Sequence, residues 1–189
     1  MAGPSTAAPG ELETVRGFVN TLDVEDGIDA LADPAALARW LRDRSLLDAA
    51  ATVSVGDVGR AVALREALRE ALRANHDRAP MPAGVLAALN DVAARAELAV
   101  ELGPAGRWVA RPRAGGVDGA LGALLVLVAD AVADGSWTRL KVCANDACQW
   151  GFYDRSRART GRWCTMRLCG NRAKQQAWRA RDRDPVSPA

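Results

Sequence analysis

The chain has 189 residues, 49% of them hydrophobic and 25% charged, which excludes wholesale disorder and fits one ordinary domain or two small ones. Its net charge of +2 hides a division: residues 1–136 carry 13 basic and 19 acidic side chains, and residues 137–189 carry 12 basic and 4 acidic ones. Opposite charge in the two parts indicates two modules with different partners.

The chain begins with a small, proline- and glycine-rich segment, and we expect residues 1–10 to be disordered. The segment lacks the basic and apolar regions of a signal peptide. The most apolar stretch, residues 121–132, contains Asp130 and is shorter than the roughly 20 residues that a membrane span needs. We therefore expect a cytoplasmic protein with no membrane partner, whose thiols stay reduced and available to metals.

Apolar side chains recur at helical spacing in four segments of the first hundred residues. The predicted helices cover residues 11–22, a segment opened by the N-cap and proline pair Asp33-Pro34, residues 55–75, and a segment opened by Pro82. Together they predict a helical N-terminal part.

The longest predicted helix carries two distinct rows of side chains. The apolar row would face the core and consists of Leu64, Leu68 and Leu72. Beside Glu66 and Glu70 runs a basic row of Arg65, Arg69 and Arg73. We interpret the charged row as a solvated face with ion pairs within the helix.

After this helical region the period changes. Residues 98–110 alternate between apolar and polar or small side chains around a turn at residues 103–106, which predicts a β-hairpin. Residues 118–134 then form an apolar helix that we place in the core, and Gly135 ends it. We set the domain boundary there: a helical domain at residues 11–135, expected to fold by itself, and a second module at residues 136–184.

All four cysteines lie in one 27-residue window as two C-x4-C pairs: Cys143, Cys148, Cys164 and Cys169. Four thiolates complete the tetrahedral coordination of a structural zinc ion and leave no position for a catalytic water. We therefore predict that these residues hold one structural Zn²⁺. The segment between the pairs would form a short hairpin and the segment after Cys169 a helix, as in a treble-clef-like module.

Two other uses of four cysteines stay open. Disulfides are disfavoured without a secretory signal, and an iron–sulfur cluster takes the same four ligands. The single histidine, His76, lies far upstream near a predicted helix end, and we interpret it as a surface residue and not as a ligand or base.

The cysteine-containing module is strongly basic. Such a surface is typical of proteins that bind the phosphate backbone of nucleic acids. The candidate nucleic-acid-binding residues are Arg155, Arg157, Arg159, Arg162, Arg172 and Lys174. The alternative is that these side chains solubilise a module with little core and pair with the acidic N-terminal part.

The segment from Trp163 to Lys174 resembles the CGNR zinc finger, whose name is spelled here by Cys169-Gly170-Asn171-Arg172. The segments 140–143 and 150–154 also match that family's pattern. The N-terminal part resembles the ABATE domain, which accompanies this finger in bacteria. Its matching segments are residues 18–23, 40–41 and 64–69.

These resemblances imply a bacterial transcription regulator in which the finger binds DNA and the helical domain senses a ligand or assembles as a homodimer. The fold class expected is mainly α: a helical domain with one β-hairpin and a small zinc finger. Asn20 and Thr21, at the end of the first helix, are candidates for binding a small-molecule ligand; the alternative is local hydrogen bonding at a helix end.

Two other functions were weighed. A protein-interaction module would use the same basic finger to bind an acidic partner. An enzyme is disfavoured, because the sequence shows no nucleophile–base pair, phosphate loop or open metal site. We therefore expect no catalytic activity.

Overall fold

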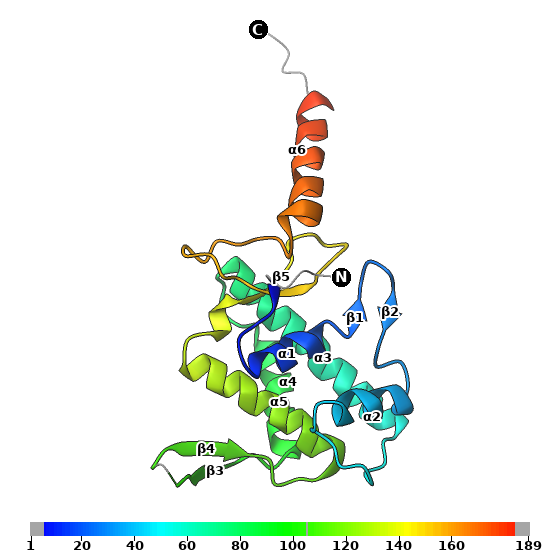
Figure 1. Cartoon of the computed structure of the whole chain (residues 1–189), viewed down its shortest axis with the longest axis vertical. Coiled ribbons are helices and arrows are strands. Elements are labelled where there is room, and N and C mark those ends of the chain that lie inside the picture. The colour runs from blue at the N-terminus through cyan, green and yellow to red at the C-terminus, as the bar shows by residue number, and fades with distance from the viewer. Residues whose placement is uncertain (1–5, 105, 184–189) are drawn as a thin grey trace.

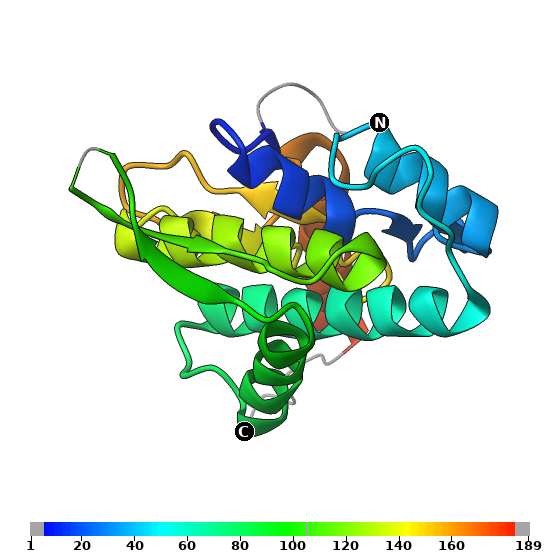
Figure 2. The same ribbon diagram turned by 90° about the horizontal axis from the view of Figure 1, so that it is seen from below.

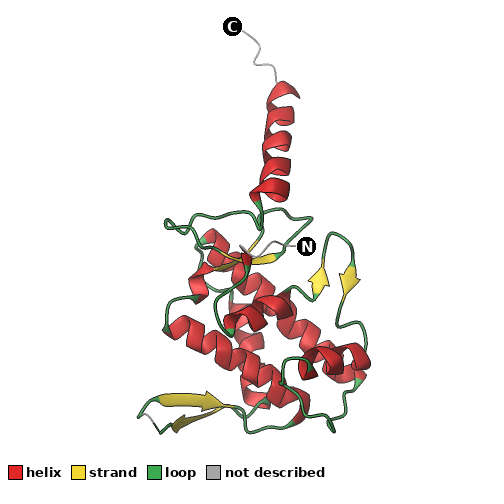
Figure 3. Ribbon diagram, viewed as in Figure 1, coloured by secondary structure: helices red, strands yellow, loops and turns green. Residues whose placement is uncertain are grey.

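The structure, a computed structural model, describes residues 6–104 and 106–183. Its described residues form six α-helices: α1 (Leu12–Val19), α2 (Pro34–Arg42), α3 (Val55–Asp77), α4 (Ala83–Arg95), α5 (Gly116–Ala133) and α6 (Asn171–Arg183). Three antiparallel strand pairs join them: β1 (Leu22–Asp23) with β2 (Ile28–Asp29), β3 (Ala99–Leu102) with β4 (Trp108–Arg111), and β5 (Leu140–Val142) with β6 (Gly151–Tyr153). The predicted mainly-α class with a small C-terminal finger is confirmed (Figure 3).

The core lies around α5, which packs against α1, α3 and α4 (Figure 2). Phe18, Leu68 and Leu124 are fully buried there. By length and composition alone α5 could cross a membrane, and half of it is buried by the surrounding protein. A helix that neighbours cover on several sides needs apolar residues around most of its circumference, which explains its composition.

Local signals start α2 and α3, and the one at α2 was predicted from the sequence. The Asp33 side chain accepts a 2.8 Å hydrogen bond from the amide of Ala36 at the start of α2. At α3, Ser54 and Asp57 form a reciprocal capping box. Both arrangements satisfy amide groups that lack partners in the first turn of a helix.

The strand pairs differ from expectation in number and exposure. The predicted hairpin is present as β3–β4, and it projects from the body with Val100 and Trp108 largely exposed (Figure 1). The pair β1–β2 was not predicted, because two-residue strands have no readable period. Its turn is acidic, and Asp23 holds it by accepting from the amides of Glu25 and Asp26.

The N-terminal segment is described in part. Residues 1–5 of the segment predicted to be disordered lie outside the described part; of residues 6–10, Thr6 and Ala8 are buried, and Pro9 and Gly10 are exposed. Ala8 belongs to the main core at 7% exposure, and its amide donates to the carboxylate of Glu13 at 2.7 Å. The buried Ala8 side chain and one partly buried hydrogen bond therefore hold this segment against α1.

The main core also crosses the boundary set near Gly135. Trp137, in the short 3-10 helix η2 (Trp137–Arg139), and Leu140 and Val142 of β5 are buried among residues of the helical part. The first strand of the finger is therefore part of the same apolar core as α3 and α5.

Candidate metal centre and nucleic-acid interface

Cys143 and Cys148 form a tight knuckle between β5 and β6. Asn145 shapes it: its carbonyl accepts from the amides of Cys148 and Gln149, and its side chain accepts from Ala147. Gln149 has a left-handed backbone with φ of 50°, which turns the chain sharply into β6. Residue-by-residue hydrogen bonding thus sets the direction of both thiols.

Cys169 lies within a tight π-helical turn, η3 (Met166–Gly170), and Cys164 lies two residues before that turn. Thr165 caps this turn, because its hydroxyl accepts from the amide of Leu168 at 3.2 Å. The turn runs directly into α6, so the backbone of α6 begins at a cysteine ligand.

The four sulfur atoms meet with the geometry of one metal site. All four Sγ atoms lie within 4.8 Å of one another, and Cys164 Sγ lies 3.7 Å from the Sγ atoms of both Cys148 and Cys169. Zinc–sulfur bonds of about 2.3 Å in a tetrahedron separate the sulfurs by about 3.8 Å. The cysteines are free thiols, and the cofactor that they fit is one structural zinc ion.

The thiols alone cannot all ionise at this distance. Hydrogen bonds from Cys148 and Cys164 lower the pKa of Cys143 to about 2. Hydrogen bonding to Cys143 raises the pKa of Cys148 to about 12. Hydrogen bonding to Cys143 and Cys148 raises the pKa of Cys164 as well. A divalent cation would neutralise the crowded negative charge and so stabilise four thiolates together.

The centre has an apolar and polar surround of its own. Cys143, Cys148 and Cys169 form a second buried cluster against which Trp150 and Trp163 pack. The amide nitrogen of the Asn145 side chain lies 3.8 Å from Cys169 Sγ, a contact that links the two knuckles. Such contacts orient ligands and limit solvent access.

The finger docks on one face of α3. Arg69, only 4% exposed, donates to the carbonyls of Val19 and Gln149 at 2.7 and 3.1 Å and pairs with Glu66. Arg73 reaches the Gln149 side chain at 2.9 Å. These contacts tie α3 to the residue that follows Cys148.

The same face continues along α3 in both directions. Asn75 donates to the carbonyls of Trp137 and Leu140. Arg65 is 2% exposed and pairs with Asp29 at 2.6 Å and with Glu66. The interpretation of this arginine row as a solvated face is therefore wrong for Arg65 and Arg69: their partners include backbone carbonyls and a carboxylate distant in the sequence, which no helical periodicity reveals.

The two predicted ligand-binding residues lie where the helical part meets the finger. The side-chain amide of Asn20 accepts from the amide of Gly151 at 2.6 Å and donates to its carbonyl at 2.9 Å. The Thr21 hydroxyl donates to the carbonyl of Phe18 at 2.7 Å, which is the local bonding weighed as the alternative. Asn20 thus pairs with β6 as a strand would, and a ligand role for the two residues stays a prediction.

A buried ion pair organises the loop between the knuckles. Lys141 Nζ lies 2.8 Å from Asp154, with both side chains 3% or less exposed. Burial alone would raise the pKa of Asp154, but hydrogen bonds from Lys141, Ser156 and the amide of Gly161 lower it to about 2. Lys141 also donates to the carbonyl of Arg159 at 2.7 Å. The loop is therefore fixed at several backbone positions.

All six candidate nucleic-acid-binding residues are exposed: Arg155, Arg157, Arg159, Arg162, Arg172 and Lys174. Three of them make contacts with the helical part, one of which is the hydrogen bond that the carbonyl of Arg159 accepts from Arg78 at 3.3 Å. Arg155 donates to the carbonyl of Ala7 at 3.0 Å, and Arg172 pairs with Glu25 of the β1–β2 turn at 2.6 Å. The loop residues and the α6 residues lie at the same end of the molecule as the zinc site (Figure 1).

Comparison with known proteins identifies two families along the chain. The sequence model of the ABATE family, described as "Putative stress-induced transcription regulator", matches residues 14–135, and that of the CGNR zinc finger matches residues 139–182. The chain belongs to the ABATE family. No curated protein matches it. As the resemblance in sequence predicted, an ABATE domain is followed by a CGNR finger.

The structure gives a physical role to the residues by which the ABATE domain was recognised. Asn20, Arg65 and Arg69 belong to the matching segments, and all three form buried or half-buried contacts at or beside the finger junction. Sequence reasoning missed this role. One signal for it was available: the arginine row is flanked by alanines, and Ala61, Ala67 and Ala71 are buried, so the apolar surface of α3 continues on both sides of the row.

Proposed function

We propose that this ABATE-family protein is a DNA-binding transcription regulator that contacts duplex DNA through its zinc finger. One observation carries the proposal: a metal-anchored, exposed basic surface at one end of an otherwise acidic molecule. Its helix α6 projects from the body (Figure 1), and a single helix fits the major groove of B-DNA.

The two kinds of basic residue would act differently. Arg157 and the other loop arginines would follow phosphates, which supply affinity without sequence information. Arg172 and Lys174 follow Cys169 directly, so a bound zinc would fix their backbone and lower the entropy cost of a defined contact. In this proposal the helical domain senses or assembles, the protein works in the cytoplasm, and no catalytic step is involved.

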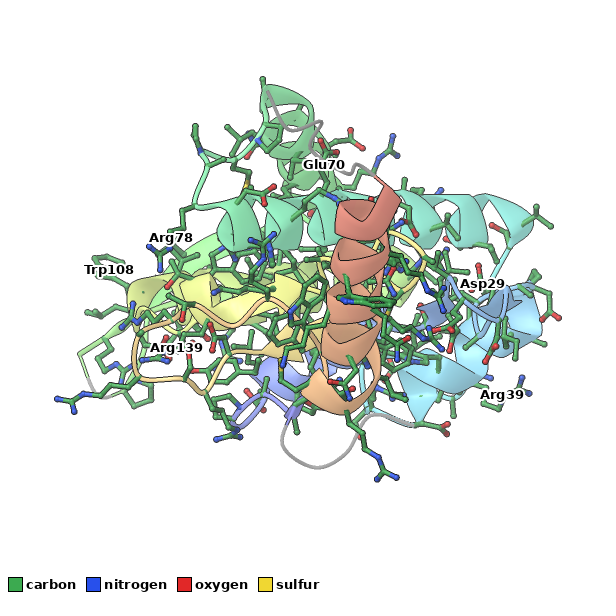
Figure 4. The ribbon with its side chains drawn as sticks, turned by 90° about the horizontal axis from the view of Figure 1, so that it is seen from above. Asp29, Arg39, Glu70, Arg78, Trp108 and Arg139 are labelled. Carbon is green, nitrogen blue, oxygen red and sulfur yellow. The ribbon has the colours of Figure 1, made fainter. Side chains whose placement is uncertain are left out.

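The test is duplex binding by the zinc-loaded full chain, measured by fluorescence anisotropy over a range of salt concentrations. We expect log K to fall linearly with log salt. Arg157→Gln should reduce the magnitude of that slope by about one unit. The matched control is Arg39→Gln, an exposed arginine of α2 far from the finger (Figure 4), and it should leave the slope unchanged. Absence of duplex binding at low salt would overturn the proposal.

A second candidate function rests on apolar side chains of the same finger. Met166, Leu168 and Trp178 are 54%, 55% and 60% exposed on this basic module. Exposed apolar residues beside charge are typical of protein-binding surfaces. If the finger binds an acidic protein instead, Trp178→Ala should abolish that binding, whereas duplex affinity should be negligible in the unaltered protein.

A further inference from the structure

A basic cavity lies at the junction of the helical domain and the finger. Its volume is about 320 Å³, within the range of small-molecule sites. His76, Asp77 and Arg78 line it from the C-terminal end of α3, and Lys141, Arg159 and Arg162 line it from the finger. Figure 4 labels Arg78 at that end of α3. We call this space the junction cavity.

The positive charge of the junction cavity is not balanced by neighbouring acids. Within the described part of the chain, no carboxylate lies within ion-pair distance of Arg78, Arg159 or Arg162. Only Asp77 contributes a negative charge to the lining, while Asp154 balances Lys141 from behind. Several like charges around one space repel one another, and a bound anion would remove that repulsion.

The lining is also held in place by bonds that leave donors free. Arg78 donates one hydrogen bond, at 3.3 Å, to the carbonyl of Arg159, and a guanidinium has five N–H groups. Lys141 fixes the same carbonyl at 2.7 Å. The remaining N–H groups of Arg78 and those of Arg159 and Arg162 are therefore available to a ligand on a preorganised frame.

Two features of α3 bear on the positive charge of the junction cavity. The C-terminal end of a helix carries partial negative charge, but the carbonyls of Ala74 and Asn75 already accept from the amides of Ala79 and Arg78. The pKa of His76 is lowered by burial and by the charges of Arg162 and Lys141, although Asp77 opposes the shift. The lining of the junction cavity therefore keeps more positive than negative charges.

We propose that the junction cavity binds a phosphate-bearing anion through Arg78, Arg159 and Arg162. Guanidinium groups match phosphate oxygens in charge and in paired geometry. A neighbouring cavity of about 430 Å³ shares Arg78, Lys141 and Arg159 with it and adds Asn75 and Thr138, so the rest of a phosphorylated molecule has a place. Because the lining comes from both domains, a bound phosphate would hold the loop between the two cysteine pairs against the end of α3.

The direct test titrates pyrophosphate, at constant ionic strength, into the zinc-loaded full chain by isothermal calorimetry. We expect one site per chain. Arg159→Gln and Arg78→Gln should each weaken binding about tenfold or more, because each removes charge-assisted hydrogen bonds. Zinc content and the melting temperature of each variant establish that it is folded.

Arg167→Gln is the matched control, because Arg167 is an exposed arginine of the finger that neither lines the cavity nor belongs to the candidate nucleic-acid-binding residues. It should change the affinity less than about twofold. Equal losses for Arg167→Gln and Arg159→Gln would show general charge attraction and overturn the site. Undetectable binding of pyrophosphate to the unaltered protein would overturn it as well.

A competition experiment identifies the source of the phosphate. If duplex DNA displaces pyrophosphate and Arg159→Gln weakens both, the cavity takes a phosphate of the DNA backbone. If pyrophosphate binds equally well to the protein with and without duplex, the ligand is a free phosphorylated molecule. Both results support a phosphate site. The calorimetric test needs no duplex, so its result can be interpreted even if the proposed DNA binding fails.

Discussion

The two halves of the finger are attached to the molecule in different ways. Residues 137–153 are docked on the helical domain, and we call them the docked half. Leu140 and Val142 are buried in the core of that domain, and its Asn20 and Asn75 side chains donate hydrogen bonds to the backbone of the docked half. From Met166 onward the chain turns outward, and α6 projects from the body (Figure 1).

The metal site lies where the docked half of the finger meets the projecting half. Cys143 and Cys148 lie in the docked half, Cys169 lies in the projecting half, and Cys164 lies two residues before the chain turns outward. One ion bound by all four would therefore fix the direction of α6 relative to α3. If α6 binds DNA as proposed, the helical domain would influence it through this ion and through the ion pair of Glu25 with Arg172.

The largest expected effect is that of removing zinc. Metal binding supplies about 10–16 kcal/mol of folding free energy in zinc-finger peptides, so Cys164→Ser or chelation should unfold the projecting half. The docked half should keep its order, because Leu140 and Val142 are held by the core. Hydrogen exchange checks this: protection should vanish from about residue 162 onward and persist at 140–142. Loss at both places would mean that the two halves fold as one unit.

The next effect concerns the core that crosses the boundary near Gly135. Trp137→Ala should lower the free energy of unfolding by about 3–5 kcal/mol, because the side chain is 5% exposed in the main core. Trp178→Ala in the projecting half is the matched control, since that side chain is 60% exposed, and it should leave stability unchanged. Urea denaturation of both variants measures the contrast. By the same argument, a fragment ending at residue 135 should be less stable than one ending at residue 156.

The buried pair of Lys141 and Asp154 should come close behind. Lys141→Met would leave a buried carboxylate without its partner, at a cost of about 3–5 kcal/mol. Replacing both residues by apolar ones should restore part of the loss. Asp146→Asn, on a carboxylate that is 90% exposed, should cost little by comparison.

The same pair predicts a dependence on pH. The pKa of Asp154 falls from an ordinary 3.8 to about 2 in the folded protein. Its stabilising contribution is therefore fully present above about pH 4 and is lost as the pH falls toward 2. The difference in stability between the unaltered protein and Asp154→Asn should shrink over that interval. A constant difference would contradict the lowered pKa.

A smaller effect is expected at the arginine row of α3. Arg69→Gln should destabilise the protein by about 2–3 kcal/mol, because it leaves the carbonyls of Val19 and Gln149 and the Glu66 carboxylate short of a donor. Arg73→Gln should cost less than about 1 kcal/mol, because the Arg73 side chain is 40% exposed. Equal costs would contradict the difference in burial.

These arginines also mark how far sequence reasoning reaches. The cap of α2, the β3–β4 hairpin and the cysteine set could be predicted, because each is encoded by residues close together in the sequence. The docking of the finger could not, because Arg69 contacts Gln149, 80 residues away, and Asn20 contacts Gly151, 131 residues away. Such partners are chosen by tertiary packing. A buried arginine and an exposed one have the same helical spacing, and only their neighbours in space distinguish them.

The smallest expected effect on stability, and the most informative about function, lies at the exposed pair of Glu25 and Arg172. The two side chains are 43% and 48% exposed, so Glu25→Gln should leave the melting temperature almost unchanged. The substitution does release Arg172, whose guanidinium the acidic β1–β2 turn otherwise holds. If Arg172 contacts DNA, duplex affinity at low salt should rise by less than about fivefold, and the gain should fade as salt increases.

Asp26→Asn is the control for that experiment, because it removes the same charge from the same turn without touching Arg172. Affinity that rises equally in both variants would reflect the general charge of the turn. A rise in Glu25→Gln alone, abolished when Arg172→Gln is added, would show that the helical domain competes with DNA for one residue of the finger. That competition would be a direct route by which a change in the β1–β2 turn could alter DNA binding without moving α6.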